Sequence, residues 1–111
     1  MSAYIPERGD VAWLSLDPQA GHEQAGRRPA VILSPRAYNE KTGLAIVCPL
    51  TTRLKGYAFE VLAEIAGKQS AVLADQVKNV DWRARRAEHL ATLSVETVDR
   101  VATIVAALIG A

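Results

Sequence analysis

Apolar residues in this chain fall in short runs separated by turn-forming residues. Five runs are predicted to be strands: residues 11–16, 30–34, 44–49, 58–62 and 71–80. The first run ends at Asp17-Pro18 and the second at Pro35, as strands bounded by turn residues do. Strands this short, without helices alternating between them, indicate a small curled sheet or barrel rather than βαβ units.

The last part of the chain has a helical pattern instead. Ser94 is a suitable N-cap for a helix that begins at Val95, and Gly110 is a suitable end. Apolar residues at helical spacing form one stripe: Val98, Val101, Ala102, Val105, Leu108 and Ile109. We therefore expect one mainly-β or α+β domain over residues 1–111, with five to seven short strands and a C-terminal helix of about four turns.

Composition narrows the class of protein. The 111 residues include one cysteine, Cys48, so no intrachain disulfide can form, and His22 and His89 complete no metal-binding spacing with it. The N-terminus has no apolar signal core, and the apolar stretch at residues 101–109 is too short to span a bilayer. We expect a soluble, cytoplasmic protein that does not bind a membrane.

Charge is unevenly distributed although the net charge is only +1. Residues 27–55 carry six basic residues and one acidic residue, and residues 76–86 carry four basic residues and one acidic residue. These segments therefore have net charges of +5 and +3, which leaves −7 for the rest of the chain. This segregation fits a basic face that meets a polyanion, and scattered solvated charges are the alternative.

The polar loop at residues 21–29, GHEQAGRRP, concentrates the reactive side chains. Its glycines permit unusual backbone angles, and Pro29 fixes the backbone where a strand begins, which presents Arg28 from a rigid position. Gly21 and Gly26 have the spacing of a phosphate-binding loop, but arginines stand where its Lys and Ser or Thr belong. No metalloprotease motif or carboxylate cluster appears, so we expect neither a metal nor a cofactor.

RNA cleavage needs no metal because its nucleophile, the 2′-hydroxyl, belongs to the substrate. Such an enzyme needs a proton acceptor, which Glu23 could be, and a fixed cation beside the phosphate, which Arg28 could be. His22 could act as acid or base, or be a solvated bystander. The alternative for Arg28 and Glu23 is an ordinary surface ion pair.

Other segments allow two interpretations each. Thr51 and Thr52 could bond phosphate oxygens beside Arg53 and Lys55, or could bond nearby backbone in a turn. Within the apolar run 71–80, Asp75 could satisfy backbone donors and Gln76 could hold an RNA base. The segment 82–86, WRARR, is typical of nucleic-acid binders, yet a single tryptophan is usually a core residue. We assign Trp13, Tyr38 and Cys48 to packing.

Taken together, these segments resemble the MazF/PemK-like toxins of bacterial toxin–antitoxin systems over nearly the whole chain. The matching segments are Asp17-Pro18, residues 21–31 (GHEQAGRRPAV), 33–35 (LSP), 38–39 (YN), 41–43 (KTG), 49–52 (PLTT), 55–57 (KGY), 74–78 (ADQVK) and 82–85 (WRAR). The resemblance implies a homodimeric SH3-like barrel that cleaves single-stranded RNA sequence-specifically and without metal. Its products would be a 2′,3′-cyclic phosphate and a 5′-hydroxyl, and a cognate antitoxin would bind it.

The resemblance also assigns roles to residues. Arg28 and Thr51 become the main catalytic pair, supported by Glu23, while His22 departs from the small polar residue usual in the family. Residues expected to contact RNA are Gln24, Arg27, Thr52, Arg53, Lys55, Gln76, Lys78, Arg83 and Arg85. The basic segments suit an acidic antitoxin tail, and DNA binding by the toxin alone is not expected. The alternative is a non-catalytic barrel that acts by binding, as gyrase poisons of the same fold do.

Overall fold

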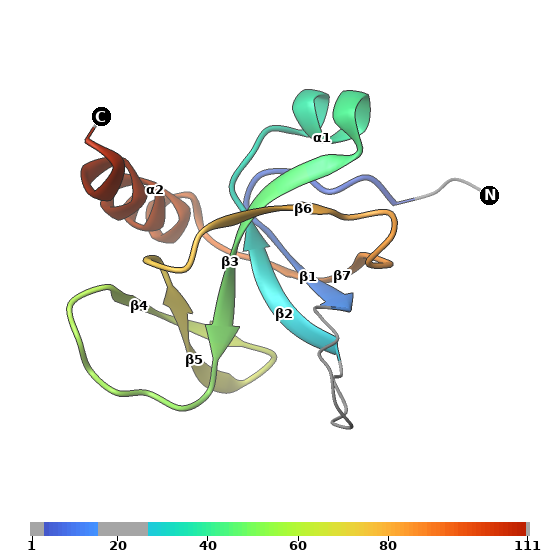
Figure 1. Ribbon diagram of the computed structural model, residues 1–111. Helices are drawn as coiled ribbons and strands as arrows, with labels where there is room; N and C mark the ends of the chain where they lie inside the picture. The colour runs from blue at the N-terminus through green and yellow to red at the C-terminus, as the bar shows by residue number, and fades with distance from the viewer. Residues whose placement is uncertain (1–3, 16–26, 111) are drawn as a thin grey trace, which may run out of the picture.

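The computed structural model describes residues 4–15 and 27–110 (Figure 1). The strands are β1 (Asp10–Ser15), β2 (Arg27–Ile32), β3 (Leu44–Thr51), β4 (Glu60–Ile65), β5 (Lys68–Leu73), β6 (Lys78–Asp81) and β7 (Glu88–Thr92), and the helices are α1 (Arg36–Thr42) and α2 (Val95–Ile109). The strands form one sheet in the order β4-β5-β3-β2-β1-β7, with β6 paired to β3. The expected mainly-β class with a C-terminal helix is confirmed. No helix in these two ranges is long and apolar enough to cross a membrane.

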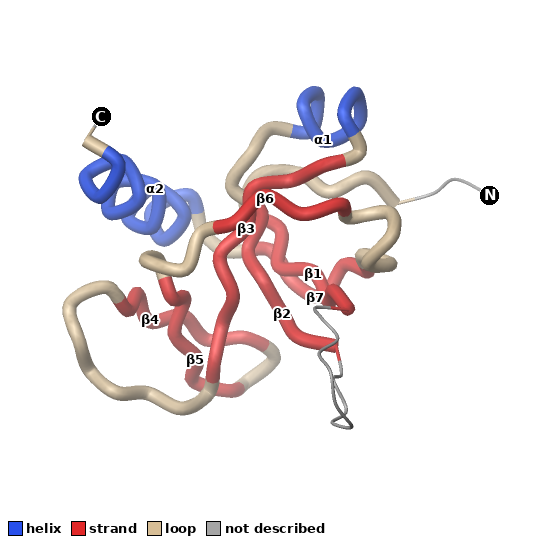
Figure 2. Tube along the Cα trace, in the orientation of Figure 1, coloured by secondary structure: helices blue, strands red, loops and turns tan. Residues whose placement is uncertain are grey.

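Strand β3 connects the two parts of the curled sheet (Figure 2). Its first half pairs with β6, from Leu44 opposite Asp81 to Val47 opposite Lys78. Its last residue, Thr51, pairs instead with Ala71 of β5. All these pairings are antiparallel. Strand β2 also pairs with β3, through the middle residues Val47, Cys48 and Pro49 of β3. The end of β3 is thereby held beside the β4–β5 hairpin.

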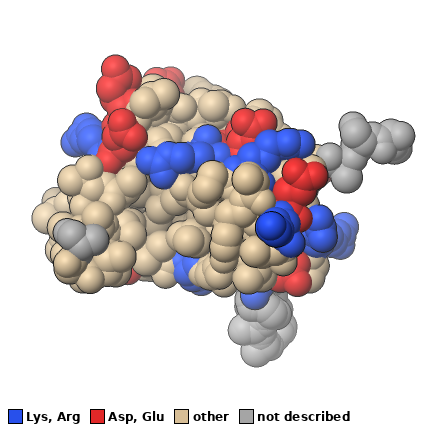
Figure 3. Space-filling model, turned by 90° about the horizontal axis from the view of Figure 1, so that it is seen from above, with Lys and Arg blue, Asp and Glu red and all other residues tan. Residues whose placement is uncertain are grey.

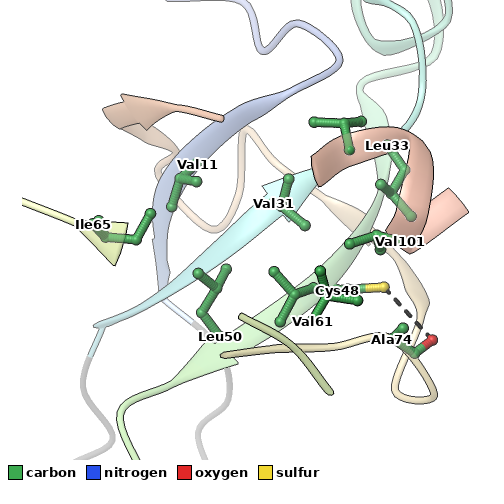
Figure 4. Packing of buried hydrophobic residues seen from close by; sticks show 11 residues of the cluster. Val11, Val31, Leu33, Cys48, Leu50, Val61, Ile65, Ala74 and Val101 are labelled. Carbon is green, nitrogen blue, oxygen red and sulfur yellow. Dashed lines mark hydrogen bonds between the residues drawn. The ribbon is translucent and has the colours of Figure 1, made fainter. Parts of the chain in front are cut away.

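Successive side chains of β1 and β2 point to opposite faces of the sheet, and residues on both faces are buried. Val11 and Val31 pack in one apolar cluster, which Val98 and Val101 of α2 cover. Figure 4 shows side chains of this cluster from β1, β2, β3 and α2 meeting between the sheet and the helix. The alternate positions, such as Leu14, belong to a second cluster on the other face.

Helix α2 begins and ends where the sequence predicts. The Ser94 hydroxyl accepts a hydrogen bond from the Thr97 backbone N–H at 3.2 Å, and Gly110 ends the helix with φ of +83°. The apolar stripe differs from the expectation at its end, since Leu108 and Ile109 are 48% and 70% exposed. The packing face is therefore confined to the earlier turns of the helix.

Three expectations about local structure are wrong. The run 71–80 is two strands, β5 and β6, separated by a turn at residues 74–75. Asp75 consequently lies in that turn and not in a strand. Its carboxylate accepts a hydrogen bond from the Tyr57 hydroxyl at 3.5 Å. The fourth strand covers residues 60–65 instead of 58–62.

Two elements were not predicted at all. The seven-residue helix α1 has no apolar stripe, and only Asn39 within it is buried. Strand β7 lies at the edge of the sheet, and none of its residues is buried. Because neither element carries a clear hydrophobic period, the sequence pattern gives no signal for them.

Candidate active site

A cleft of about 900 Å³ lies between the ends of β2 and β3 and the tip of the β4–β5 hairpin. These three elements lie together in the lower half of Figure 1. The cleft brings together five of the predicted site residues: Arg27, Arg28, Thr51, Thr52 and Arg53. Two segments that are more than 20 residues apart in the sequence thus form one site.

Arg28 is the exposed cation of the β2 side of the cleft. Its backbone pairs with Leu14 of β1, and the next residue, Pro29, pairs with Trp13. No carboxylate among residues 4–15 and 27–110 forms an ion pair with its guanidinium. A guanidinium presents parallel N–H donors, so the Arg28 side chain is suited to clamp two oxygens of a phosphate.

Thr51 faces the same cleft from the end of β3. Its Oγ1 accepts a hydrogen bond from the backbone N–H of Arg53 at 3.0 Å. This bond is the turn-type contact considered for the threonines, and it leaves the Thr51 hydroxyl proton free to donate to a substrate oxygen. The arrangement therefore orients the hydroxyl without using its donor.

Arg27 also lines the cleft, but its guanidinium is bonded to protein acceptors. Nη1 donates to the Ser15 hydroxyl at 2.8 Å, and Nη2 donates to the backbone oxygen of Arg86. Nη2 also lies 3.2 Å from a carboxylate oxygen of Glu88. These contacts tie the start of β2 to the end of β1, to the turn before β7 and to the first residue of β7.

Comparison with known proteins gives the family. The profile described as "PemK-like, MazF-like toxin of type II toxin-antitoxin system" matches residues 7–109. The chain belongs to this toxin family. It is 46% identical over 110 residues to the endoribonuclease toxin MazF of Escherichia coli K12, covering 99% of both chains. It is 36% identical to the endoribonuclease PemK of Escherichia coli, covering 88% of this chain and 80% of PemK.

Solved structures of MazF proteins have the same fold. A MazE–MazF crystal structure from Deinococcus radiodurans superposes with a TM-score of 0.89 at 49% identity, covering 97% of this chain and 98% of that one. MazF alone from the same organism gives a TM-score of 0.87 at 48% identity, covering 98% and 100%. The resemblance to MazF/PemK-like toxins inferred from the sequence motifs is thus confirmed.

Several residues predicted to contact RNA lie outside the lining of the cleft in this MazF-like chain: Lys55, Gln76, Lys78, Arg83 and Arg85. Lys78 is on β6, and the Arg83 guanidinium stacks 4.8 Å from the centre of the Trp82 ring. Figure 3 shows the face above α1 and β6, where basic side chains lie beside acidic ones. The RNA contacts of these residues remain predictions.

Packing assignments are confirmed in part. Trp82 is only 5% exposed and donates its indole N–H to the Asn39 backbone oxygen at 2.8 Å, so it is a core residue. Cys48 is fully buried. Trp13 is half-buried and also lines the cleft, and Tyr38 is half-buried with its hydroxyl accepting a bond from Asn79.

Glu23, Gln24 and His22 lie outside the described residues. Within the described part of the chain, no three His, Cys, Asp or Glu side chains group closely enough to hold a metal ion.

Two polar residues of the cleft, Lys68 and Ser70, were not predicted from the sequence. Both belong to β5, which begins three residues before the predicted strand. The sequence does contain a signal for the β4–β5 hairpin: the dipeptide Ala66-Gly67 lies between two strand-like runs. A short loop containing Gly is typical of a hairpin turn. Recognising that hairpin would have placed Lys68 directly after its turn.

Proposed function

We propose that this chain is the endoribonuclease toxin of a type II toxin–antitoxin pair and that the cleft is its active site. It cleaves single-stranded RNA, including mRNA, at specific sequences and without a metal ion. The observation that carries this proposal is the meeting of Arg28 from β2 and Thr51 from β3 in one cleft. The relatives named endoribonucleases support the reaction class.

Cleavage proceeds through attack of the substrate's 2′-oxygen on the neighbouring phosphorus. The new bond between O2′ and phosphorus forms as the bond from phosphorus to O5′ breaks, which leaves a 2′,3′-cyclic phosphate and a 5′-hydroxyl. Arg28 stabilises the charge on the non-bridging oxygens, and the Thr51 hydroxyl donates a hydrogen bond to one of them. Glu23 accepts the 2′ proton, and the departing O5′ takes up a proton from water.

The toxin acts as a cytoplasmic homodimer held inactive by a cognate antitoxin. MazE–MazF crystal structures from Deinococcus radiodurans support a partner of this type. The basic segments at residues 27–55 and 76–86 favour an antitoxin with an acidic tail. The toxin alone has no need to bind DNA.

The decisive experiment compares Arg28→Ala with Arg100→Ala on a long mixed RNA in excess chelator, followed by sequencing of the cut ends. Arg100 is an exposed arginine of α2 outside the cleft, so it controls for loss of one positive charge. Removing a group that stabilises transition-state charge costs about 10²- to 10³-fold in rate, so Arg28→Ala should lose at least that much. Arg100→Ala should cut like the parent protein.

Each result has a clear meaning. Equal cutting by Arg28→Ala would refute the role of Arg28, and cutting of an RNA with 2′-deoxyribose at the cleaved linkage would refute the internal nucleophile. Failure of the parent protein to cut any RNA would favour the non-catalytic barrel that acts by binding.

A further inference from the structure

One of the basic residues of the cleft, Lys68, comes from the β4–β5 hairpin. Lys68 lies at the tip of the β4–β5 hairpin, where Ala66 and Gly67 form a two-residue turn with φ of +51° and +82°. Both turn residues have positive φ, as the tight hairpin turns that match strand twist require. Lys68 pairs with Ile65 directly after this turn, so its backbone is held by the hairpin.

The strand pleat determines which side chains of β5 face the cleft. Lys68 and Ser70 both line the cleft, whereas Gln69 between them does not. This alternation is the one expected for a regular strand, because successive side chains point to opposite faces. Gln69 is therefore a neighbour of Lys68 whose side chain points to the opposite face of β5.

The register between β5 and β3 sets the distance from Lys68 to the catalytic pair. Thr51 pairs with Ala71, which is three residues after Lys68 on β5. Three residues of extended strand correspond to about 10 Å. The backbone of Lys68 thus lies well beyond the position at which Thr51 and Arg28 hold one phosphate.

We infer that Lys68 binds a phosphate of the RNA next to the scissile one and thereby sets the path of the strand through the cleft. The inference rests on the proposed RNA-cleaving function and adds a substrate contact on the hairpin wall. A cleft of about 900 Å³ is large enough for more than one phosphate group.

Charge supports a phosphate as the ligand of Lys68. Of the cleft-lining residues, Arg27, Arg28, Arg53 and Lys68 are basic, and the described lining includes no carboxylate. No described carboxylate forms an ion pair with Lys68. An ammonium group has only donors and binds phosphate as a point charge, so it adds affinity without reading a base.

The test uses a charge exchange between two adjacent residues. Lys68→Gln removes the cation, and the double variant Lys68→Gln/Gln69→Lys restores the composition with the ammonium on the opposite face of β5. The probe is an RNA oligonucleotide containing the cut site found by end sequencing, made non-cleavable by 2′-deoxyribose at that linkage. Its dissociation constant is measured over a series of salt concentrations.

Loss of one phosphate contact to a single strand lowers the slope of log affinity against log salt by about 0.7. We expect this change in both variants, with binding weakened about fivefold at 0.1 M salt. Neutral methylphosphonate linkages then locate the phosphate, since one linkage beside the cleaved one should weaken binding to the parent protein but not to Lys68→Gln.

Three results would overturn the inference: an unchanged salt slope, full recovery of affinity in the exchange variant, or additive effects of Lys68→Gln and every neutral linkage. In each case RNA cleavage by the parent protein would still stand. Failure of the parent protein to cut RNA would refute the proposed function itself.

Discussion

Two regions of the molecule use polar side chains in opposite ways: the buried hydrogen-bond network of Asn39, and the cleft. Asn39 is fully buried, and its Nδ2 donates to the backbone oxygens of Pro6 at 2.8 Å and Ser34 at 3.1 Å. Its Oδ1 accepts from the Ser34 hydroxyl, whose oxygen accepts from the Ile46 N–H at 2.9 Å. In the cleft, by contrast, Arg28, Arg53 and Lys68 pair with none of the described carboxylates.

The difference separates residues that stabilise the fold from residues available to a ligand. Burying a polar group without a partner costs about 1–3 kcal/mol, so an interior network must be complete. Exposed cations stabilise the fold little and keep their donors for a substrate. The contrast holds even between neighbours, because Arg27 is bonded to protein while Arg28 is not paired with any described carboxylate.

The largest effect on stability is expected from Asn39→Ala. The substitution leaves the backbone oxygens of Pro6 and Ser34 and the hydroxyl of Ser34 without the partner they have now. We expect a loss of about 3 kcal/mol in the free energy of unfolding. In a thermal melt this corresponds to a decrease in Tm on the order of 10–20 °C for a domain of this size.

Asn79→Ala is the matched control for that variant. Asn79 is exposed on β6, and its side chain donates to the Tyr38 hydroxyl at 3.1 Å, so its loss should cost less than about 1 kcal/mol. Both variants should cut RNA normally at temperatures where they are folded. Equal melting temperatures for the two would show that the Asn39 network is not an important source of stability.

A smaller effect is expected when Arg27→Gln and Arg28→Gln are compared. Arg27→Gln loses charge-assisted bonds in a partly exposed setting and should lower the free energy of unfolding by about 1–2 kcal/mol in urea titrations. Arg28→Gln should change it by less than about 0.5 kcal/mol while abolishing cleavage. If Arg28→Gln proved the less stable variant, the division between the two arginines would be wrong.

The sequence predicted the elements that bury a regular apolar face. Helix α2 was located with its caps, because Ser94, Gly110 and the apolar spacing agree. Helix α1 could not be found in this way, since its one buried residue, Asn39, is polar and packs through hydrogen bonds. Strand β7 has an exposed edge and little apolar content, so its existence depends on pairing with β1.

The candidate site was predictable to a similar degree. Arg28 and Thr51 were singled out by loop chemistry and by the resemblance to MazF/PemK-like toxins, and the structure places both at one cleft. Lys68 was not predicted because the sequence pattern placed the start of its strand at Ala71, three residues too late. The protein bonds of Arg27 depend on long-range contacts with Ser15 and Arg86, which no spacing in the sequence reveals.

The ionisation of Cys48 reports how well the middle of β3 is shielded from water, in contrast to the end of the same strand, where Thr51 lines the cleft. Burial, together with the nearby Asp75 carboxylate, raises the pKa of its thiol to about 12. The thiol of the unfolded chain ionises from about pH 8.5, so above that pH the native state binds more protons than the unfolded state. Stability should therefore fall as the pH rises.

Urea titrations of the parent protein and Cys48→Ala at pH 8 and pH 10 measure this contribution. The free energy of unfolding of the parent should fall by about 2 kcal/mol more than that of the variant over this interval. Other groups that titrate there, including the tyrosines, are common to both proteins and cancel in the difference. A constant difference between the two proteins would mean that the thiol ionises as readily in the fold as outside it, and that the middle of β3 is as open to water as its end at the cleft.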